Sequence, residues 1–158
     1  MLRRVVSGGQ TGVDRAGLDA AVGAGLPIGG HCPKGRLAED GAIPEAYPLT
    51  EMDTPLPRYR TEKNVLESDG TLILNKGALT EGTKLTHDFT VKYGKPSLIV
   101  QLDAAGIIKP EHVARWIEGQ QIGTLNVAGP RESKCAGGIY AEAFAYIERV
   151  FALIRESS

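Results

Sequence analysis

Short apolar runs alternate along the chain with longer segments in which apolar residues recur at helical spacing. The apolar runs predict five strands. The first begins at Val5, and the other four cover 26–30, 70–74, 97–102 and 124–128. The helical segments are 13–24, 60–67, 80–93, 110–119 and 140–154. Strands that alternate with helices, at spacings too long for hairpins, are typical of a parallel sheet with helices on both faces. The pattern therefore predicts an α/β fold, a doubly wound parallel sheet of about five strands in a three-layer sandwich.

Two of these elements carry further expectations. The run at 97–102 is almost wholly apolar, which is typical of a strand covered on both faces. The last helix carries Tyr140, Phe144, Ile147 and Phe151 on one stripe, which is broader than one sheet face needs. We therefore expect the chain to form a homo-oligomer through its helices.

Residues 37–58 follow neither the helical nor the strand period. They hold four prolines and a glycine, a composition typical of irregular structure. Ile43, Tyr47, Leu49 and Leu56 can anchor this segment against the core. A long ordered loop inside a compact domain is usually functional, so we expect 37–58 to cover a site.

The first predicted strand runs through a glycine loop, residues 8–12, into the first helix. Gly8 and Gly9 let the backbone approach a bound group closely. Thr11 suits the N-cap, and Asp14, three residues on, completes a capping box. The free N–H groups of the first turn then offer a site for a phosphate or another oxyanion. The alternative is a plain strand-to-helix turn, because the stretch is neither the dinucleotide fingerprint G-x-G-x-x-G nor a P-loop.

Four polar loops follow predicted strands and meet at the carboxyl edge of the sheet, where open α/β folds bind their ligands. They are residues 8–11, 31–36, 75–83 and 129–134. Backbone donors together with a few cations describe a site for a phosphate-like dianion. The candidate binding residues are Gly8, Gly9, Gln10, Thr11, Gly12, Lys34, Gly35, Arg36, Asn75, Gly82, Thr83, Gly129, Arg131 and Ser133.

The cations among these candidates also have structural explanations. Lys34 and Arg36 can be solvated charges on a turn. Arg131 can form a local ion pair with Glu132 that caps the last helix. Thr80 can be the cap of the helix at 80–93, which would reduce the next few residues to an ordinary helix start.

Catalytic and metal-binding patterns are weaker in this sequence. The serines of the polar loops have no evident His and acid partners, and the three histidines match no metal-binding motif. His31 with Cys32 and Cys135 could supply soft metal ligands, but a loop histidine and partly buried thiols explain them more simply. Arg60 and Asn64, one turn apart, are more typical of a surface pair than of a clamp. We therefore expect neither an integral metal nor an assigned catalytic residue.

Length and charge bound the function further. A chain of 158 residues is expected to form one domain, 1–158, large enough to fold without a metal or a disulfide. With 18 basic and 19 acidic residues the net charge is −1, so no long-range field attracts nucleic acid or an anionic membrane. Two cysteines form no disulfide framework, and residues 1–5 show no signal peptide or membrane span, which favours a cytoplasmic protein. Because the net charge gives no long-range attraction, an anion must be held by groups at the binding site itself.

Five motifs, in order, resemble one known family. They are Gly8-Gly9-Gln10-Thr11-Gly12-Val13-Asp14-Arg15, Cys32-Pro33-Lys34-Gly35-Arg36, Arg60-Thr61-Glu62-Lys63-Asn64-Val65, Ser68-Asp69-Gly70-Thr71-Leu72-Ile73 and Val127-Ala128-Gly129-Pro130-Arg131-Glu132-Ser133. Through these motifs the chain resembles the molybdenum carrier (molybdenum cofactor carrier-like) family, and the match covers nearly its whole length. The resemblance implies a Rossmann-like fold, shared with nucleoside-monophosphate phosphoribohydrolases and DNA-processing proteins. It also implies a nucleotide-like or phosphate-bearing ligand at the glycine loop.

The chain departs from one of these relatives. The phosphoribohydrolases resemble P-G-G-x-G-T-x-x-E around their phosphate loop, where this chain has residues 78–86. Gly82 and Thr83 are kept, but Thr86 stands at the position of the catalytic glutamate. Glu81 also adds a negative charge beside the expected anion. These differences weaken the prediction of a hydrolase.

The resemblance therefore favours a binding protein that carries molybdenum cofactor, or a related phosphate-bearing ligand such as a nucleotide, without changing it. The alternative is an enzyme that cleaves or transfers a nucleotide, with Asp14, Glu81 or Glu132 as its carboxylates. DNA binding needs a basic stripe that the balanced composition does not supply.

Overall fold

The computed structural model describes residues 1–157 and places five strands in one parallel sheet. The strands are β1 (Arg4–Val6), β2 (Ile28–Gly29), β7 (Gly70–Asn75), β8 (Ser97–Gln101) and β9 (Thr124–Ala128). Their order across the sheet is β2-β1-β9-β7-β8, and every neighbouring pair is parallel. The predicted parallel sheet of about five strands is confirmed.

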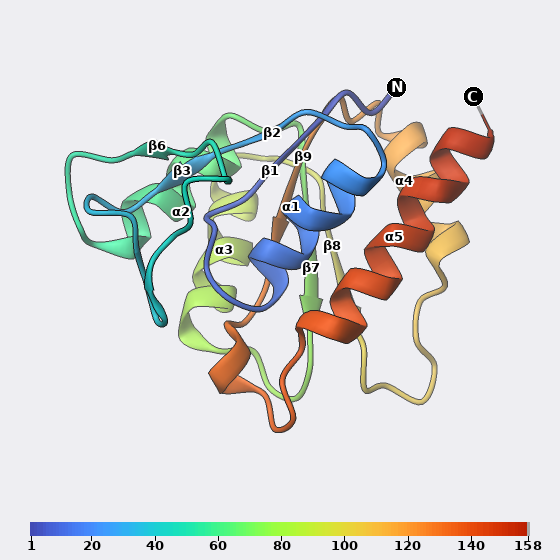
Figure 1. Cartoon of the computed structure of the whole chain (residues 1–158). Coiled ribbons are helices and arrows are strands. Elements are labelled where there is room, and N and C mark those ends of the chain that lie inside the picture. The colour runs from blue at the N-terminus through green and yellow to red at the C-terminus, as the bar shows by residue number, and fades with distance from the viewer. Residues whose placement is uncertain (158) are drawn as a thin grey trace.

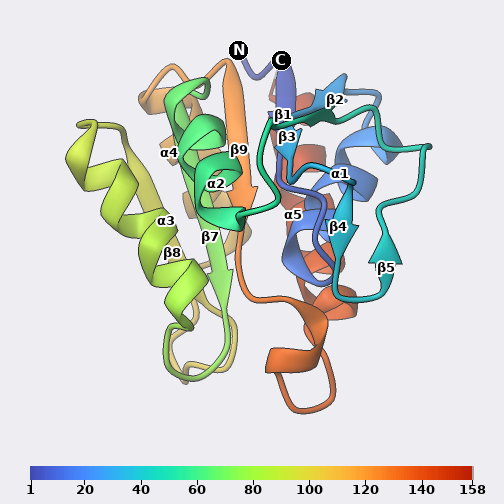
Figure 2. The same cartoon turned by 90° about the vertical axis from the view of Figure 1, so that its left-hand side faces the viewer.

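Two helical layers enclose the sheet (Figure 1). The helices α1 (Val13–Gly23), α4 (Pro110–Gly119) and α5 (Tyr140–Glu156) pack together on one face. The helices α2 (Pro57–Leu66) and α3 (Glu81–Lys92) lie together on the other, in front of the sheet in Figure 2. The result is the Rossmann-like three-layer α/β fold that the sequence predicts.

The position of β9 decides which loops meet. It is the last strand in the sequence, yet it lies between β1 and β7. Its pairing sets Val6 of β1 beside Asn126, and Ile73 of β7 beside Ala128. Because these three central strands are parallel, the chain leaves all of them at the same edge of the sheet, and the loops that follow them lie side by side.

The main core fills the space between the sheet and the layer of α1, α4 and α5. Leu72, Leu125 and Val127 of the sheet are fully buried and belong to one cluster with Ile147 and Phe151 of α5. The apolar stripe of α5 is thus used inside the chain, with Tyr140 and Phe144 packed partly against the same cluster. The stripe therefore gives no support to the predicted homo-oligomer, which stays a prediction.

Residues 31–51 form two small sheets beside the main one. The strand β3 (His31–Cys32) pairs in parallel with β6 (Thr50–Glu51), and β4 (Leu37–Ala38) forms an antiparallel hairpin with β5 (Gly41–Ala42). Short strands of two residues leave too weak a period to be read from the sequence. The segment is ordered, as predicted.

Three of the four predicted anchors hold this segment in place. Ile43 and Leu49 are buried in a second apolar cluster, and Tyr47 packs against it. The Tyr47 hydroxyl also donates a hydrogen bond to Asp19 of α1 at 2.7 Å. Leu56 is 55% exposed, so its prediction as an anchor is wrong. It stands directly before α2, which turns the chain away from the cluster.

Two further expectations about single elements need correction. Only Val100 of the five residues in β8 is buried, so this strand is not covered on both faces. The reason is its place at the edge of the sheet, where it pairs with β7 alone. Helix α2 begins three residues earlier than predicted, because Pro57 fits the first helical turn. Among the helices of residues 1–157, none is long and apolar enough to cross a membrane.

Candidate functional site

A cleft of about 500 Å³ opens at the carboxyl edge of the sheet. Its walls come from the glycine loop, α2, the first turns of α3, and the end of β9 with the loop that follows. These are the loops that the central position of β9 brings together. Such a volume lies in the usual range for small-molecule sites, roughly 300 to 1,000 Å³.

The glycine loop touches the loop after β9 through Gly12. Gly12 has φ +83°, and a Cβ there would lie 2.6 Å from the Pro130 carbonyl oxygen and 2.8 Å from the Glu132 nitrogen. Only glycine combines this positive φ with so close a backbone approach. The Val13 N–H donates to the same Pro130 carbonyl at 3.4 Å, so this N–H of the first turn of α1 is not free for an anion.

The predicted capping box does not form. Gly12, not Thr11, is the N-cap of α1, and no side chain caps that end. The hydroxyl of Thr11 is instead engaged by the hairpin β4–β5 and by the loop after β9. Asp14 does reach back to the loop, where its Oδ2 accepts a hydrogen bond from the Gln10 N–H at 3.2 Å.

Asp14 is a buried carboxyl group in the wall of the cleft, with 7% of its surface exposed. Burial disfavours its charged form and raises its pKa to about 6, although the positive charges of Arg60 and Arg15 and the hydrogen bonds from the loop backbone act in the other direction. A carboxyl group that titrates near neutral pH can donate or accept a proton under physiological conditions.

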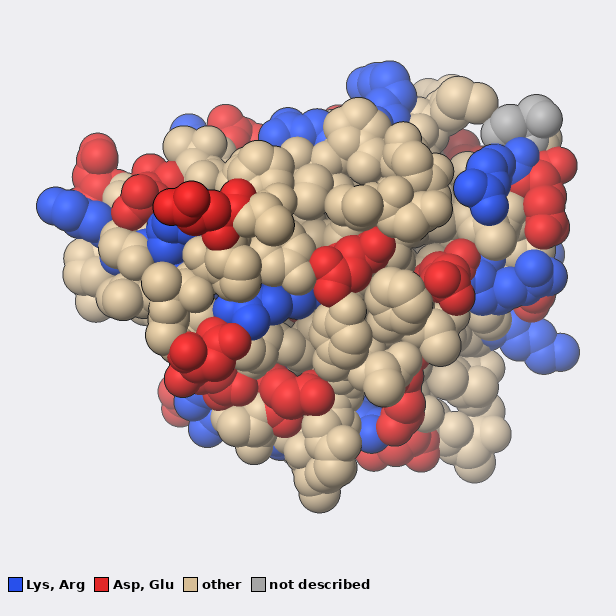
Figure 3. Space-filling view, in the orientation of Figure 1, with Lys and Arg blue, Asp and Glu red and all other residues tan. Residues whose placement is uncertain are grey.

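Basic side chains outnumber acidic ones around the cleft. Arg58, Arg60, Arg131 and Lys134 line it, against Asp14 and Glu81. The Arg60 guanidinium donates to the Gly8 carbonyl at 2.9 Å, which fixes it beside the glycine loop. Elsewhere the charges are mixed, and the face shown in Figure 3 has basic and acidic groups interspersed without an extended basic patch. The local excess of positive charge suits an anion.

The first turn of α3 forms another wall. Thr80 is the N-cap, and its side chain accepts a hydrogen bond from the Thr83 N–H at 3.3 Å. Gly82 faces open space, since a Cβ there would meet no atom within 4 Å. The Thr86 hydroxyl donates to the Gly82 carbonyl at 3.1 Å, so an alcohol stands where the phosphoribohydrolases have their glutamate.

The structure brings together ten of the fourteen predicted binding residues. Six of them line the cleft, namely Gly8, Gln10, Gly82, Thr83, Gly129 and Arg131. Four others lie in the two loops that adjoin it, namely Gly9, Thr11, Gly12 and Ser133. The remaining four, Lys34, Gly35, Arg36 and Asn75, do not line the cleft.

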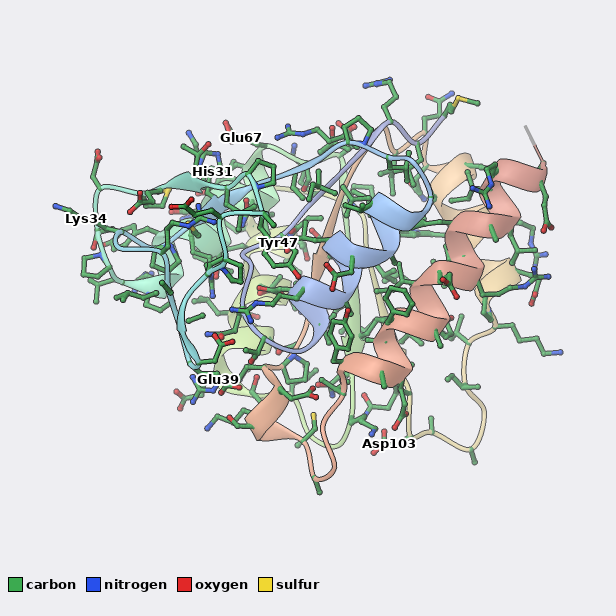
Figure 4. The ribbon with its side chains drawn as sticks, in the orientation of Figure 1. His31, Lys34, Glu39, Tyr47, Glu67 and Asp103 are labelled. Carbon is green, nitrogen blue, oxygen red and sulfur yellow. The ribbon has the colours of Figure 1, made fainter. Side chains whose placement is uncertain are left out.

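Arg36 and its neighbours hold residues 31–51 together. The Arg36 guanidinium donates to four backbone carbonyls, those of Ile43, Pro44, Tyr47 and Leu49, at 2.8 to 3.2 Å. The Gly35 N–H donates to Glu51. Lys34 lies at the outer end of this region, well away from Glu39 in Figure 4.

Asn75 ends β7 with its side chain turned into the protein. Its Nδ2 donates to the Gly77 carbonyl at 2.8 Å and to Gln101 Oε1 at 3.0 Å. Its Oδ1 is the only buried side-chain nitrogen or oxygen of residues 1–157 without a hydrogen-bond partner. Asn75 therefore supports the turn after β7 rather than the wall of the cleft.

The proposed pair between Arg131 and Glu132 is not formed. Arg131 Nε lies 3.2 Å from Glu39 Oε2, on the hairpin β4–β5. Glu132 itself stabilises the start of the last helix, because its Oε1 accepts the N–H groups of Ile139 and Tyr140 at 2.7 and 2.8 Å. Glu132 therefore stabilises the start of the last helix without Arg131, and Arg131 stays a candidate for ligand binding.

Sequence reasoning missed Glu39 and misjudged Arg60 and Asn64. Asn64 is 3% exposed, and its amide pairs with both backbone groups of His31 at 2.8 and 3.0 Å, so it clamps α2 to β3. Arg60 lines the cleft, and the expectation of a surface pair is wrong. The Arg60–Val65 motif was the only signal available for either residue.

The metal hypothesis gains no support from the geometry. Cys32 is buried in the second apolar cluster and Cys135 in the main one. Within residues 1–157, no group of three or more His, Cys, Asp or Glu side chains could hold a metal ion. Burial raises the pKa of both thiols, which disfavours the thiolate form that binds metals.

Comparison with known proteins agrees with the fold and with the motifs. The model of the circularly permutated YpsA SLOG family matches residues 5–151. The crystal structure of the "putative molybdenum carrier protein" from Syntrophus aciditrophicus SB is similar, with a TM-score of 0.85 and 47% sequence identity over 95% of this chain and 94% of that chain. Among curated proteins, none matches. The similarity to molybdenum carrier proteins is confirmed, and the chain belongs to the circularly permutated YpsA SLOG family.

Proposed function

We propose that the chain is a small-molecule binding protein that holds a phosphate-bearing ligand in the cleft without changing it. The observation that carries this proposal is the cleft itself, about 500 Å³ in volume, with four basic side chains against two acidic ones. The wall also includes Gly82, where a Cβ would meet no atom within 4 Å, and Gly8, against which the Arg60 guanidinium is packed. Guanidinium and ammonium groups gathered in one cleft suit a phosphate group.

Molybdenum cofactor is the leading ligand, because the similar protein from Syntrophus aciditrophicus bears the name of a molybdenum carrier. In this proposal the phosphate lies near Arg131, and the glycine loop and the first turn of α3 contact the rest of the ligand. Lys34, Gly35, Arg36 and Asn75 are not part of it, since they do not line the cleft. A nucleotide is the nearest chemical alternative.

Native mass spectrometry of the protein purified from its own cells, together with metal analysis, tests this function. We expect a bound mass that contains a phosphate and molybdenum, and we expect it to be lost from an Arg131→Ala variant purified in the same way. A bound nucleotide would remove molybdenum from the proposal and leave the binding function. A protein that carries no small molecule, and binds none from a panel of nucleotides and pterin phosphates, would contradict it.

A second function, hydrolysis of a nucleotide at its N-glycosidic bond, rests on Asp14. A carboxyl group with a pKa of about 6 inside the cleft could protonate a departing base. Against it, Thr86 occupies the position of the relatives' glutamate. Incubation with nucleoside monophosphates decides between the two functions. Release of free base, abolished by Asp14→Asn or by Glu81→Gln, would replace the carrier with an enzyme.

A further inference from the structure

The side chain of Glu39, at the tip of the hairpin β4–β5, sits in a cluster of hydrogen-bond donors from two other loops. Its Oε1 accepts from the Thr11 hydroxyl at 2.6 Å and from the Ser133 N–H at 3.1 Å. Its Oε2 accepts from the Ser133 hydroxyl at 2.5 Å and lies 3.2 Å from Arg131 Nε. Each carboxylate oxygen therefore has two donors, and one of the four carries a positive charge.

These donors are set in place by the backbone rather than by Glu39 alone. The Thr11 hydroxyl accepts a hydrogen bond from the Glu132 N–H at 3.2 Å, which leaves its single proton free to point at Glu39. Although desolvation opposes ionisation, the hydrogen bonds from Ser133 and Thr11 and the charge of Arg131 hold the pKa of Glu39 below its usual value. The cluster binds a negatively charged oxygen pair, and only 20% of the Glu39 side chain is exposed.

The same cluster adjoins the cleft. Arg131 lines the cleft and also reaches Glu39, so it belongs to both places. Gln10, another residue of the cleft wall, accepts the Glu39 N–H on its side-chain oxygen at 3.0 Å. A ligand in the cleft could thus place one oxyanion group among these donors if Glu39 moved away.

The hairpin is held over the cleft's edge by polar contacts at its tip. Asp40 forms a two-point pair with Arg15 at 2.6 and 2.9 Å, and the Asp40 side chain is 49% exposed. Leu37 is 52% exposed, and both residues of β5 are exposed as well. The Arg15 side chain of this pair is only 12% exposed, so movement of the hairpin that breaks the pair has a cost that ligand binding must offset. Of residues 37–42, Ala38 alone packs against an apolar cluster, so movement of Glu39 at the tip disturbs few apolar contacts.

We propose that Thr11, Arg131 and Ser133 form an oxyanion subsite for a phosphate group of the ligand, which Glu39 fills in the empty protein and vacates when the ligand binds. The proposal rests on the proposed function and adds to it the place of the phosphate and a built-in competitor. Glu39 supplies two oxygens at hydrogen-bond distance from four donors, which is the arrangement that two oxygens of a phosphate need. While Glu39 occupies the subsite, it lowers the apparent affinity for the ligand.

Substitution of the competitor tests this subsite with simple probes, inorganic phosphate and pyrophosphate. Glu39→Gln keeps the shape of the side chain and removes its charge. We expect it to bind pyrophosphate at least about tenfold more tightly than the unsubstituted protein, because a tenfold change corresponds to only about 1.4 kcal/mol. Glu45→Gln is the matched control, since it removes one exposed negative charge from the same segment and should leave the affinity unchanged.

Two readouts separate the possible results. Calorimetry gives the affinity, and the NMR shift of the Ser133 amide reports whether the anion lies in the subsite. Equal affinity in Glu39→Gln and in the unsubstituted protein, no binding by either, or a Ser133 amide that does not move would overturn the subsite. Glu39→Ala offers a second variant for the same measurements should Glu39→Gln fold poorly.

The result also distinguishes this subsite from the proposed function. Tight binding of phosphate at Ser133 by Glu39→Gln, with no binding of any pterin phosphate or nucleotide, supports the subsite and contradicts the carrier. Binding of an organic phosphate with an unmoved Ser133 amide supports the carrier and overturns the subsite.

Discussion

Two loops with similar composition, 31–36 and 129–134, have opposite surroundings. Both follow strands, and both offer glycine and cations to a supposed anion. In the first, the Arg36 guanidinium donates to four backbone carbonyls. In the second, Arg131 lines the cleft and is 44% exposed, with one carboxylate on its Nε. Arg36 therefore stabilises residues 31–51, whereas Arg131 remains available to a ligand.

The difference shows that the partners of a charged side chain matter more than its loop. A guanidinium has five donors in a fixed fork, and Arg36 uses four of them on the irregular chain between Ile43 and Leu49. The same principle separates two carboxylates. Glu132 accepts two helix N–H groups, whereas Asp14 is buried in the cleft wall with a raised pKa.

Truncation of Arg131 should give the largest effect. Arg131→Ala removes a charged partner from a mostly desolvated anion, which typically costs about 2 to 5 kcal/mol, or at least about 30-fold in affinity. The melting temperature of the empty protein should hardly change, since the one ion pair lost is partly exposed. Calorimetry with the ligand identified from native cells measures both. Lys34→Ala is the control, and intact affinity with a lowered melting temperature in Arg131→Ala would refute the assignment of Arg131.

Truncation of Arg36 should do the reverse. Arg36→Ala removes a charged donor from four carbonyls, of which those of Pro44 and Tyr47 keep a backbone N–H, and we expect the free energy of unfolding to fall by about 3 kcal/mol. Arg36→Lys keeps the charge but not the fork, so it should also be destabilised. Urea denaturation measures the loss, and ligand affinity should change little in molecules that remain folded. An Arg36→Ala protein that is as stable as the unsubstituted protein but no longer binds the ligand would contradict the contrast between Arg36 and Arg131.

The contrast between the carboxyl groups of Asp14 and Glu132 can be tested through the pH dependence of stability. The folded pKa of Asp14 is about 6, above the value of 3.8 expected for an unfolded chain, so the folded state binds more protons between these values. The free energy of unfolding should therefore fall as pH rises from about 4 to about 6, by at most about 3 kcal/mol. Urea denaturation from pH 4 to 7 should show this decline in the difference between the unsubstituted protein and Asp14→Asn, because Glu39 and Asp40, whose pKa values are lowered, act in the opposite direction in both proteins. Glu132→Gln, which changes a saturated carboxylate, should keep the decline.

The layers of the fold were predictable because they depend on local periodicity. The strands and helices of the main fold have local sequence signals, and Thr80 marks the start of α3 as predicted, although the start of α2 at Pro57 was missed by three residues. The two small sheets were not predictable, since strands of two residues carry no period and the sequence does not show which carbonyls the Arg36 side chain binds.

The sequence predicted which loops lie at the carboxyl edge of the sheet, but not which of these loops lie next to one another, because that depends on the order of the strands. The carboxyl-edge rule gathers four loops, but the sequence does not reveal that β9 lies between β1 and β7. That position sets the loop at 129–134 against the glycine loop, while the chain after β2 runs outward into 31–51. Glu39 was missed for the same reason, since it meets Ser133 across 94 positions of sequence.

The smallest expected effect compares a glycine at the cleft with a glycine of the loop 31–36. Gly82, at the cleft, lies inside α3 and would direct a Cβ into open space, so Gly82→Ala should raise the free energy of unfolding by about 0.5 to 1 kcal/mol. Gly35, among the structural contacts of 31–51, has φ +84°, and Gly35→Ala should lower it by about 1 to 2 kcal/mol through backbone strain.

Ligand affinity should follow the opposite order in these two variants. The methyl group of Gly82→Ala projects into the space that the ligand would occupy, and it should weaken binding even though the protein is more stable. Gly35→Ala does not touch the cleft, so binding should be unchanged at temperatures where the protein is folded. Thermal melts with and without ligand measure both quantities. If Gly82→Ala bound normally while Gly35→Ala did not, the ligand would have to sit at 31–36, and the contrast between the two loops would be reversed.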